Sequence, residues 1–179
     1  MRSFRDFMKV VTTLSQDEFV EQFPHPILMF TEQPGGLDGF VHTQLTEPSE
    51  GVERIDRFSS MLLGFHIVLP NPKPSADFPR KAFVGRDPKR DFYIPHSTVS
   101  TRHACLFLDD ADDAYKLVDS SSTNGTHLRG RELKAGEPVR IFDGDVITFG
   151  TVDCLFFSSE GAYRFMRQYR LFRQVMNRD

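Results

Sequence analysis

Short apolar runs and turn residues alternate through the second half of the chain, and this alternation limits the fold more than any other feature. From Lys81 onward an apolar run returns about every eight to twelve residues, with Gly, Asn, Asp or Ser between the runs. This spacing is typical of antiparallel strands, because parallel strands need a longer, usually helical connection. We therefore predict an all-β sandwich of two facing, mainly antiparallel sheets, whose inward positions include Leu106, Leu108, Val146, Thr148 and residues 154–157.

The N-terminal part of the chain predicts two short helices and an extended segment. The first helix has one apolar face, made by Phe4, Phe7, Met8 and Val11. The second helix begins at the S-x-x-E capping box of Ser15 and Glu18 and ends before Pro24. The apolar run over residues 26–30 is most simply a strand or an extended segment laid against the sandwich. We expect this region to cover one face of the sandwich, and docking of a partner is the alternative.

The C-terminal part of the chain predicts an amphipathic helix. Its apolar stripe consists of Ala162, Phe165, Met166, Tyr169, Phe172 and Met176. Arg164, Arg167 and Arg170 lie on its other faces. The simpler interpretation is a helix that docks on the sandwich, and a basic helix that attracts an acidic partner or a membrane surface is the alternative.

Composition and charge exclude several classes of protein. The formal net charge of -3 counts against a general affinity for nucleic acid, since nucleic-acid binders concentrate positive charge on one face. No charged and then apolar leader opens the chain, and no run approaches the roughly 18 to 20 apolar residues of a membrane helix. Cys105 and Cys154 lie inside apolar runs, as reduced core cysteines do. We therefore expect a cytoplasmic protein without membrane insertion.

Three polar clusters lie at the ends of strand-like runs and predict an anion site built from loops. They are Gly85-Arg86, the segment 100–103 (Ser-Thr-Arg-His) and the segment 122–126 (Ser-Thr-Asn-Gly-Thr). A guanidinium offers paired donors that match a phosphate, and hydroxyl groups add short hydrogen bonds to its oxygens. Because each cluster follows an apolar run, a sandwich can bring all three to one end.

In order and spacing these clusters resemble the forkhead-associated (FHA) family. The family pattern is GR, then SxxH, then a loop similar to STNGT, then a late strand that begins with the sequence found here at 143–150, DGDVITFG. The resemblance covers residues 62–157, which we assign as an FHA domain. Residues 1–61 are then an N-terminal extension with a flexible linker, since residues 32–51 are rich in Gly, Pro, Ser and Thr. Residues 158–179 are the C-terminal amphipathic helix.

The resemblance assigns a role to each residue of the predicted site. It implies that the phosphopeptide is bound by five residues: Arg86, Ser100, Thr101, Thr123 and Asn124. The first four are assigned to the phosphate, and Asn124 to the backbone of the peptide. It also implies that Gly85, His103 and Gly125 support the loops without touching the ligand.

The chain departs from the family pattern at two positions. Many members carry Arg where this chain has Thr101, and Arg102, one position later, is a candidate to supply that charge. Ser121 replaces a Gly of the family, which predicts a differently bent entry to the loop. The sequence therefore predicts recognition of a phosphate better than it predicts the affinity for the phosphopeptide.

Two other kinds of chemistry are suggested by residues in this part of the chain, and both lack the pattern that they require. Ser100, His103 and Asp119 could suggest a Ser-His-Asp hydrolase, but no G-x-S-x-G elbow and no oxyanion motif accompany the serine. The acidic run over residues 109–113 lacks the alternating spacing and the closing Glu of a calcium loop, so we expect a solvated turn. We predict no catalytic residue, no metal and no cofactor.

The function that the resemblance implies is phosphothreonine-peptide binding by an adaptor in Ser/Thr kinase signalling. The expected partner is a protein or peptide that contains phosphothreonine and is the product of a Ser/Thr kinase. A phosphorylated threonine of the linker, or Thr12 or Thr13, could also fold back as an intramolecular ligand. The alternative function is a phosphate-independent scaffold that uses the same fold and its apolar flanks to bind proteins.

Overall fold

The computed structural model describes residues 2–30, 64–71 and 81–176, and the side chains of residues 3–30, 64–71 and 81–171. Within these ranges the chain forms three helices and twelve strands. The helices are α1 (Phe4–Thr13), α2 (Gln16–Gln22) and α5 (Ser159–Met176). The strands are β1 (Arg2–Ser3), β2 (Ile27–Phe30), β3 (His66–Val68), β4 (Lys81–Gly85), β5 (Phe92–Tyr93), β6 (Ala104–Asp109), β7 (Ala114–Asp119), β8 (Thr126–Leu128), β9 (Arg131–Glu132), β10 (Val139–Arg140), β11 (Val146–Phe149) and β12 (Val152–Phe157).

The strands form the two facing sheets that the sequence predicts. One sheet has seven strands in the order β1-β3-β2-β12-β11-β8-β9, and the other has five in the order β10-β7-β6-β4-β5. Every pair of neighbours is antiparallel except β4 and β5. The prediction of an all-β sandwich with mainly antiparallel sheets is therefore confirmed.

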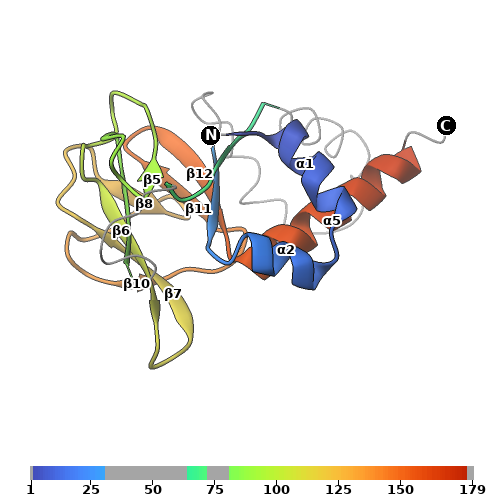
Figure 1. Cartoon of the computed structure of the whole chain (residues 1–179). Helices are drawn as coiled ribbons and strands as arrows, with labels where there is room; N and C mark the ends of the chain where they lie inside the picture. Colours follow the sequence, from blue (N-terminus) through green and yellow to red (C-terminus); the bar gives the residue numbers. More distant parts are fainter. Residues whose placement is uncertain (1, 31–63, 72–80, 177–179) are drawn as a thin grey trace, which may run out of the picture.

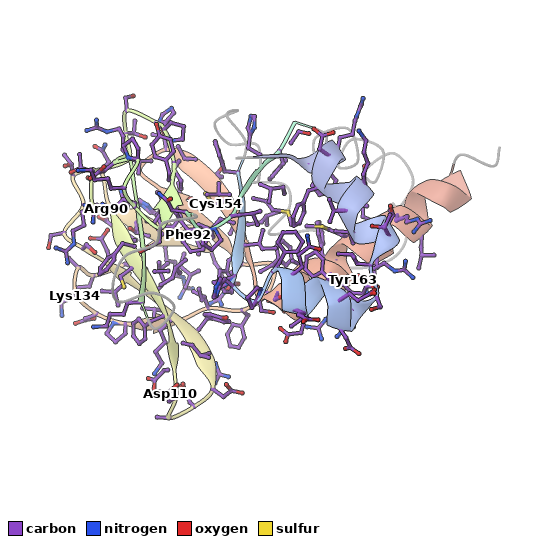
Figure 2. The ribbon with its side chains drawn as sticks, viewed as in Figure 1. Arg90, Phe92, Asp110, Lys134, Cys154 and Tyr163 are labelled. Carbon is purple, nitrogen blue, oxygen red and sulfur yellow. The ribbon has the colours of Figure 1, made fainter. Side chains whose placement is uncertain are left out.

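The three helices form a third layer against the outer face of the seven-stranded sheet. Figure 1 shows α1, α2 and α5 together on one side of the strands. All six residues of β12 are buried, because this strand has a neighbouring layer on each face. Cys154 and Phe156 face the five-stranded sheet, whereas Leu155 and Phe157 pack among the helices. Figure 2 shows the same arrangement, with Cys154 between the sheets and Tyr163 in the helical layer.

Part of the sandwich core that the sequence predicted differs from the core in the structure. Leu106 is buried between the sheets, but Leu108 is 39% exposed. Val146 faces the helices, and Thr148 donates a hydrogen bond of 2.7 Å to the buried Asp153. The prediction that all these residues point into the sandwich was wrong. In β11 and β12 alternation cannot show which face is inward, because both faces are covered. Leu108 is exposed because it lies near the end of β6, in the hairpin that leads to β7.

The N-terminal residues form the predicted elements and join the sandwich. Ser15 and Glu18 make the capping box of α2, with hydrogen bonds in both directions. The apolar run over residues 26–30 contains β2, which lies between β3 and β12 and is buried at every position. The N-terminal part thus supplies a central strand of the seven-stranded sheet. The boundaries at residues 61 and 157 stay predictions.

The C-terminal helix is anchored to the turn that precedes β11. The Asp143 carboxylate accepts hydrogen bonds from the backbone N–H of Ser158 at 2.6 Å and from Arg164 at 3.2 Å. A Cβ at Gly161 would lie only 2.0 Å from Oδ2 of Asp143, so the helix can approach this carboxylate only where there is no side chain. The buried side of the helix includes Tyr163, which the predicted apolar stripe did not contain.

Some predictions fall on residues that the structure does not describe. The linker over residues 32–51 and the side chains of Phe172 and Met176 lie outside the described parts. Among the residues that are described, no helix is long and apolar enough to cross a bilayer, and no group of His, Cys, Asp or Glu is arranged to hold a metal ion. Cys105 and Cys154 are both buried, and neither is in a disulfide bond.

We predict that Gly161→Ala lowers the free energy of unfolding by about 1–3 kcal/mol, because the added methyl group collides with Asp143. In the background of Asp143→Ala the same substitution should gain up to about 1 kcal/mol, since Ala favours a helix over Gly. Urea titration of the four proteins of this cycle measures both values. Equal effects of Gly161→Ala in the two backgrounds would contradict the contact.

We propose that the folded unit requires the N-terminal strands, and we predict that a chain beginning at residue 62 fails to fold stably. Loss of β2 would expose the edge of β12 and the apolar side chains that now pack against α1 and α2. Amide dispersion in a proton–nitrogen NMR spectrum and resistance to protease compare the two chains. A truncated chain as well dispersed and as resistant as the full one would refute the proposal.

Candidate functional site

The three polar clusters lie at one end of the sandwich, where four connections meet. They follow β4, precede β6 and join β7 to β8, and the turn between β11 and β12 lies beside them. The N–H of Gly150 in that turn donates to the carbonyl of Gly125 at 3.0 Å. The sheets therefore bring segments far apart in the sequence into direct hydrogen-bonding contact.

Arg86 is positioned by the loop before β6. Its backbone N–H donates to the carbonyl of Ser100 at 2.9 Å, and its Nε donates to the carbonyl of Val99 at 2.9 Å. The terminal guanidinium nitrogens have no carboxylate partner among the described residues. Arg86 thus presents an uncompensated positive charge at the surface. The end of β4 can lie this close to the loop before β6 because Gly85 has no side chain. A Cβ at Gly85 would lie 2.4 Å from the carbonyl oxygen of Thr101.

Ser100 and Thr123 lie across from each other on different loops. The N–H of Thr123 donates to Oγ of Ser100 at 3.0 Å, and this hydroxyl is 3.3 Å from Oγ1 of Thr123. A hydroxyl–hydroxyl bond is usually near 2.7–2.8 Å, so the longer one is weak and leaves both groups able to bind a ligand. Thr101 is exposed beside them. Its neighbour Arg102 lies over the ring of Phe83 at 5.2 Å, on the outer face of the five-stranded sheet.

His103 is fully buried and links two loops through both ring nitrogens. The N–H of Ser100 donates to Nδ1 at 2.9 Å, so Nδ1 carries no proton. Nε2 therefore carries the proton and donates to the carbonyl of Gly125 at 3.1 Å. Burial lowers the pKa of His103, and the bond to Gly125 and the charge of Asp119 oppose this effect only in part. The neutral imidazole is the form that holds the loops together.

Asp119, at the end of β7, shapes the loop that carries Thr123 and Asn124. Its carboxylate accepts hydrogen bonds from the N–H and hydroxyl of Ser122, at 3.0 and 2.6 Å, and from the hydroxyl of Thr126. Burial would raise the pKa of Asp119, but these hydrogen bonds outweigh it and lower the pKa. Sequence reasoning did not assign this residue to the support of the site, although an Asp before a Ser-rich turn is a common sign of such a cap.

Asn124 is held by a second set of residues that sequence reasoning missed. Its Nδ2 donates to the carbonyl of Thr98 at 2.8 Å, and its Oδ1 has no partner among the described residues. Thr98 is fixed in turn, since its Oγ1 accepts from the N–H of Thr151 at 3.1 Å and pairs with Nδ1 of His96 at 2.8 Å. These contacts join positions far apart in the sequence, so no local pattern indicated them.

The entry to the β7–β8 loop keeps the shape that Gly would favour. Ser121, which stands at the family's Gly position, has a φ of 61°, in the left-handed region. This conformation costs a non-glycine residue about 1–2 kcal/mol, which the hydrogen bonds of Asp119 to the next residue offset. Ser121 thus holds a left-handed conformation that glycine adopts without steric cost. The differently bent entry stays a prediction.

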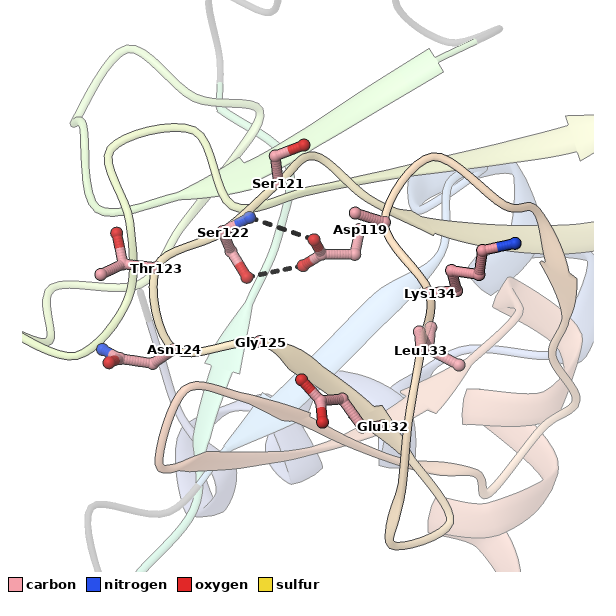
Figure 3. A pocket seen from close by; sticks show the side chains of 10 residues that line it. Asp119, Ser121, Ser122, Thr123, Asn124, Gly125, Glu132, Leu133 and Lys134 are labelled. Carbon is pink, nitrogen blue, oxygen red and sulfur yellow. Dashed lines mark hydrogen bonds between the residues drawn. The ribbon is translucent and has the colours of Figure 1, made fainter.

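The far side of this loop borders an open hollow. Figure 3 shows Thr123 and Asn124 pointing away from the hollow, while Glu132 lies on its wall below Gly125. The hollow has a volume of about 630 Å³, and neither Arg86 nor Ser100 lines it. Thr123 and Asn124 belong to the lining of the hollow, so this loop lies between the hollow and the other residues of the candidate anion site.

The structure brings together the residues named from the sequence. Hydrogen bonds between the loops connect Arg86 to Ser100 and Ser100 to Thr123. In the sequence Thr101 follows Ser100, and Asn124 follows Thr123. That they bind a phosphate stays a prediction. In many ligand-binding domains the binding residues lie on loops that a rigid scaffold holds together. The polar loops at one end of this β-sandwich have that arrangement.

Residues 82–150 match the family model described as FHA domain. This part of the chain is therefore an FHA domain, as its GR, SxxH and STNGT motifs indicated. A comparison with curated proteins gave no match.

Several solved structures of FHA domains resemble the chain. A chain from a study of phosphothreonine-dependent FHA domain interactions is 18% identical, with 74% of this chain and 94% of that chain covered and a TM-score of 0.42. An engineered FHA with a Myc-pTBD peptide is also 18% identical, with 75% and 91% covered and a TM-score of 0.46. The FHA domain of the CT664 protein from Chlamydia trachomatis is 25% identical, with 42% and 74% covered and a TM-score of 0.39.

We predict that protonation of His103 destabilises the fold. Because burial lowers its pKa, the unfolded chain takes up a proton near pH 6.5 while the folded chain does not. This contribution to stability is therefore present above about pH 6.5 and is lost as the pH falls toward the folded pKa. Chemical unfolding of the protein and of His103→Gln between pH 8 and 5 measures it, and the slope against pH should be smaller for the variant.

His25 is the matched control for this experiment, because burial also lowers its pKa and it lies outside the site. His25→Gln should remove only its own part of the slope. If His103→Gln leaves the slope unchanged and His25→Gln abolishes it, His103 is not the group that titrates.

Proposed function

We propose that the chain binds peptides that contain phosphothreonine and acts as an adaptor in Ser/Thr kinase signalling. FHA domains are interaction modules, and the family is among those that read phosphorylated motifs through arginine. The observation that carries the proposal is the uncompensated guanidinium of Arg86 beside the hydroxyl groups of Ser100 and Thr123. The expected partner is the product of a Ser/Thr kinase, and we place the interaction in the cytoplasm.

The phosphate would bind in the space shared by the three loops. It carries between one and two negative charges and three acceptor oxygens, so it needs positive charge and several donors. Arg86 would supply paired donors, because its Nε is already held by Val99 and the side chain needs little further ordering. Ser100 and Thr123 would exchange their long mutual bond for shorter ones to phosphate oxygens. The exposed backbone of Thr101 would complete the cradle.

Asn124 would hold the backbone of the peptide. Its amide group is oriented by the bond from Nδ2 to Thr98, which leaves Oδ1 to accept an N–H of the ligand. This residue therefore distinguishes a phosphorylated peptide from free phosphate.

The geometry counts against a hydrolase. In a Ser-His-Asp triad the imidazole accepts the proton of the serine hydroxyl and donates to the carboxylate. Here Nδ1 of His103 accepts the backbone N–H of Ser100, and Nε2 donates to a carbonyl. The carboxylate of Asp119 is occupied by Ser122 and Thr126. These residues support a loop and are not arranged for proton transfer.

A phosphate-independent scaffold is less well supported than phosphopeptide binding. That function would require free apolar surface on the flanks. In the described part of the N-terminal flank, Phe4, Phe7, Val11 and Phe19 are fully buried against the chain's own elements. An intramolecular phosphothreonine remains compatible with the site, although Thr12 and Thr13 are in α1 and donate to carbonyls of their own helix.

We predict that Arg86→Ala weakens binding of a phosphothreonine peptide by about 2–5 kcal/mol, because the phosphate charge loses its partner. Calorimetry or fluorescence anisotropy with peptides selected from a phosphothreonine library measures the loss. Arg140→Ala is the control, since Arg140 is also exposed but packs over Phe142, away from the three loops. Equal binding of phosphorylated and unphosphorylated peptides by the unaltered protein would favour the scaffold and exclude the proposal.

We predict that Asn124→Ala weakens phosphopeptide binding but leaves competition by inorganic phosphate unchanged. The amide is expected to contact the backbone of the ligand, so its loss should cost about 1–3 kcal/mol against the peptide alone. Competition titrations with phosphate and with the peptide separate the two effects. A parallel loss for both ligands would place Asn124 on the phosphate instead.

A further inference from the structure

The hollow beside the β7–β8 loop is a second feature with the form of a ligand subsite. It lies between this loop and the segment after β9, and its lining includes Gly125, Glu132, Leu133, Lys134 and Ala135. Its volume of about 630 Å³ is within the range of small-molecule and side-chain pockets. Thr123 and Asn124 also belong to its lining, so the hollow adjoins the proposed phosphopeptide site.

One loop separates the hollow from the proposed phosphate site. In Figure 3 the side chains of Thr123 and Asn124 are directed away from Glu132 and Lys134. The backbone of Gly125 lies between the two sides, and a Cβ there would be 3.0 Å from Oε1 of Glu132. The carboxylate of Glu132 therefore rests against the same loop that would carry the phosphopeptide.

The charge free to act in the hollow is negative. Lys134 forms an ion pair with Glu137, and Asp119 is buried and bound by Ser122 and Thr126. Glu132 is exposed, and its carboxylate has no hydrogen bond or ion pair with any described residue. An anion entering the hollow would meet an unpaired carboxylate, whereas a cation would find its counter-ion there.

We propose that this hollow binds the side chain of a Lys or Arg residue that flanks the phosphothreonine in the ligand, with Glu132 as its partner. The inference rests on the proposed function, because it needs a peptide bound on the other side of the loop. The apolar stem of the basic side chain would lie along the partly buried Leu133 and Ala135, with its charged end at Glu132. The chain would thus select a phosphothreonine with a basic neighbour.

The test compares phosphopeptides that differ at one flanking position. Each of the three positions before and after the phosphothreonine is occupied in turn by Lys, Gln or Glu, and affinities are measured for the full-length protein. The same set is measured for Glu132→Gln and Glu132→Lys, with Glu21→Gln as the matched control. Glu21 is also an exposed carboxylate but lies in α2 and does not line the hollow. Thermal melting confirms that each variant is folded.

At one flanking position Lys should be preferred to Gln by about two- to fivefold, the effect of one exposed ion pair. Glu132→Gln should abolish the preference, Glu132→Lys should convert it to a preference for Glu, and Glu21→Gln should leave it unchanged. The preference should also shrink as salt is raised.

If phosphopeptides bind but no position prefers Lys, or if Glu132→Lys does not change the preference, the inference is wrong and the proposed function stands. If no peptide binds in a phosphate-dependent manner, even to the unaltered protein, both are overturned.

Discussion

The buried imidazole of His103 is the interaction on which the candidate site depends. One ring nitrogen accepts from the loop that carries Ser100, and the other donates to the loop that carries Thr123. The ring also packs edge-on against Phe149, at 5.5 Å between centroids, so its position is fixed by the core between the sheets. The side chain of His103 thus holds two surface loops in a fixed position relative to the core. Because both loops are held before a ligand arrives, binding would require little additional ordering.

The scaffold behind the site has three layers and not two. The seven-stranded sheet packs against the other sheet on one face and against α1, α2 and α5 on the other. Aromatic contacts such as those between Phe7 and Phe19, at 5.9 Å, and between Phe4 and Tyr169, at 5.3 Å, join the N-terminal helices to one another and to the C-terminal one. These helices lie against the seven-stranded sheet, whereas the proposed phosphate cradle is built mainly on ends of the five-stranded sheet. The helical layer therefore supports the sandwich without contributing residues to the candidate site.

Most of the fold and the positions of the main site residues could be predicted from the sequence, for identifiable reasons. Apolar runs separated by turn residues gave the sheets, and a capping box gave the start of α2. The predicted inward position of Val146 was wrong, since a strand between two layers is apolar on both faces and its alternation is lost. That of Leu108 was wrong because this residue lies near the end of β6, in the hairpin that leads to β7. The supporting residues Thr98 and Thr151 could not be found either, because their contacts arise only when distant turns are brought together. The sequence could not show whether Arg102 contributes to binding. Its position over Phe83 follows from packing on the sheet surface.

The hairpin between β6 and β7 projects away from the rest of the chain, with Asp110 at its tip (Figure 2). Both strands have six residues, and the loops of the candidate site lie at their other ends. At about 3.3 Å per residue, the tip is roughly 15–20 Å from those loops. It is also distant from the helices in the view of Figure 2. A fluorophore, an affinity handle or a surface attachment placed on this hairpin would therefore report on the domain while leaving its recognition loops open to solution.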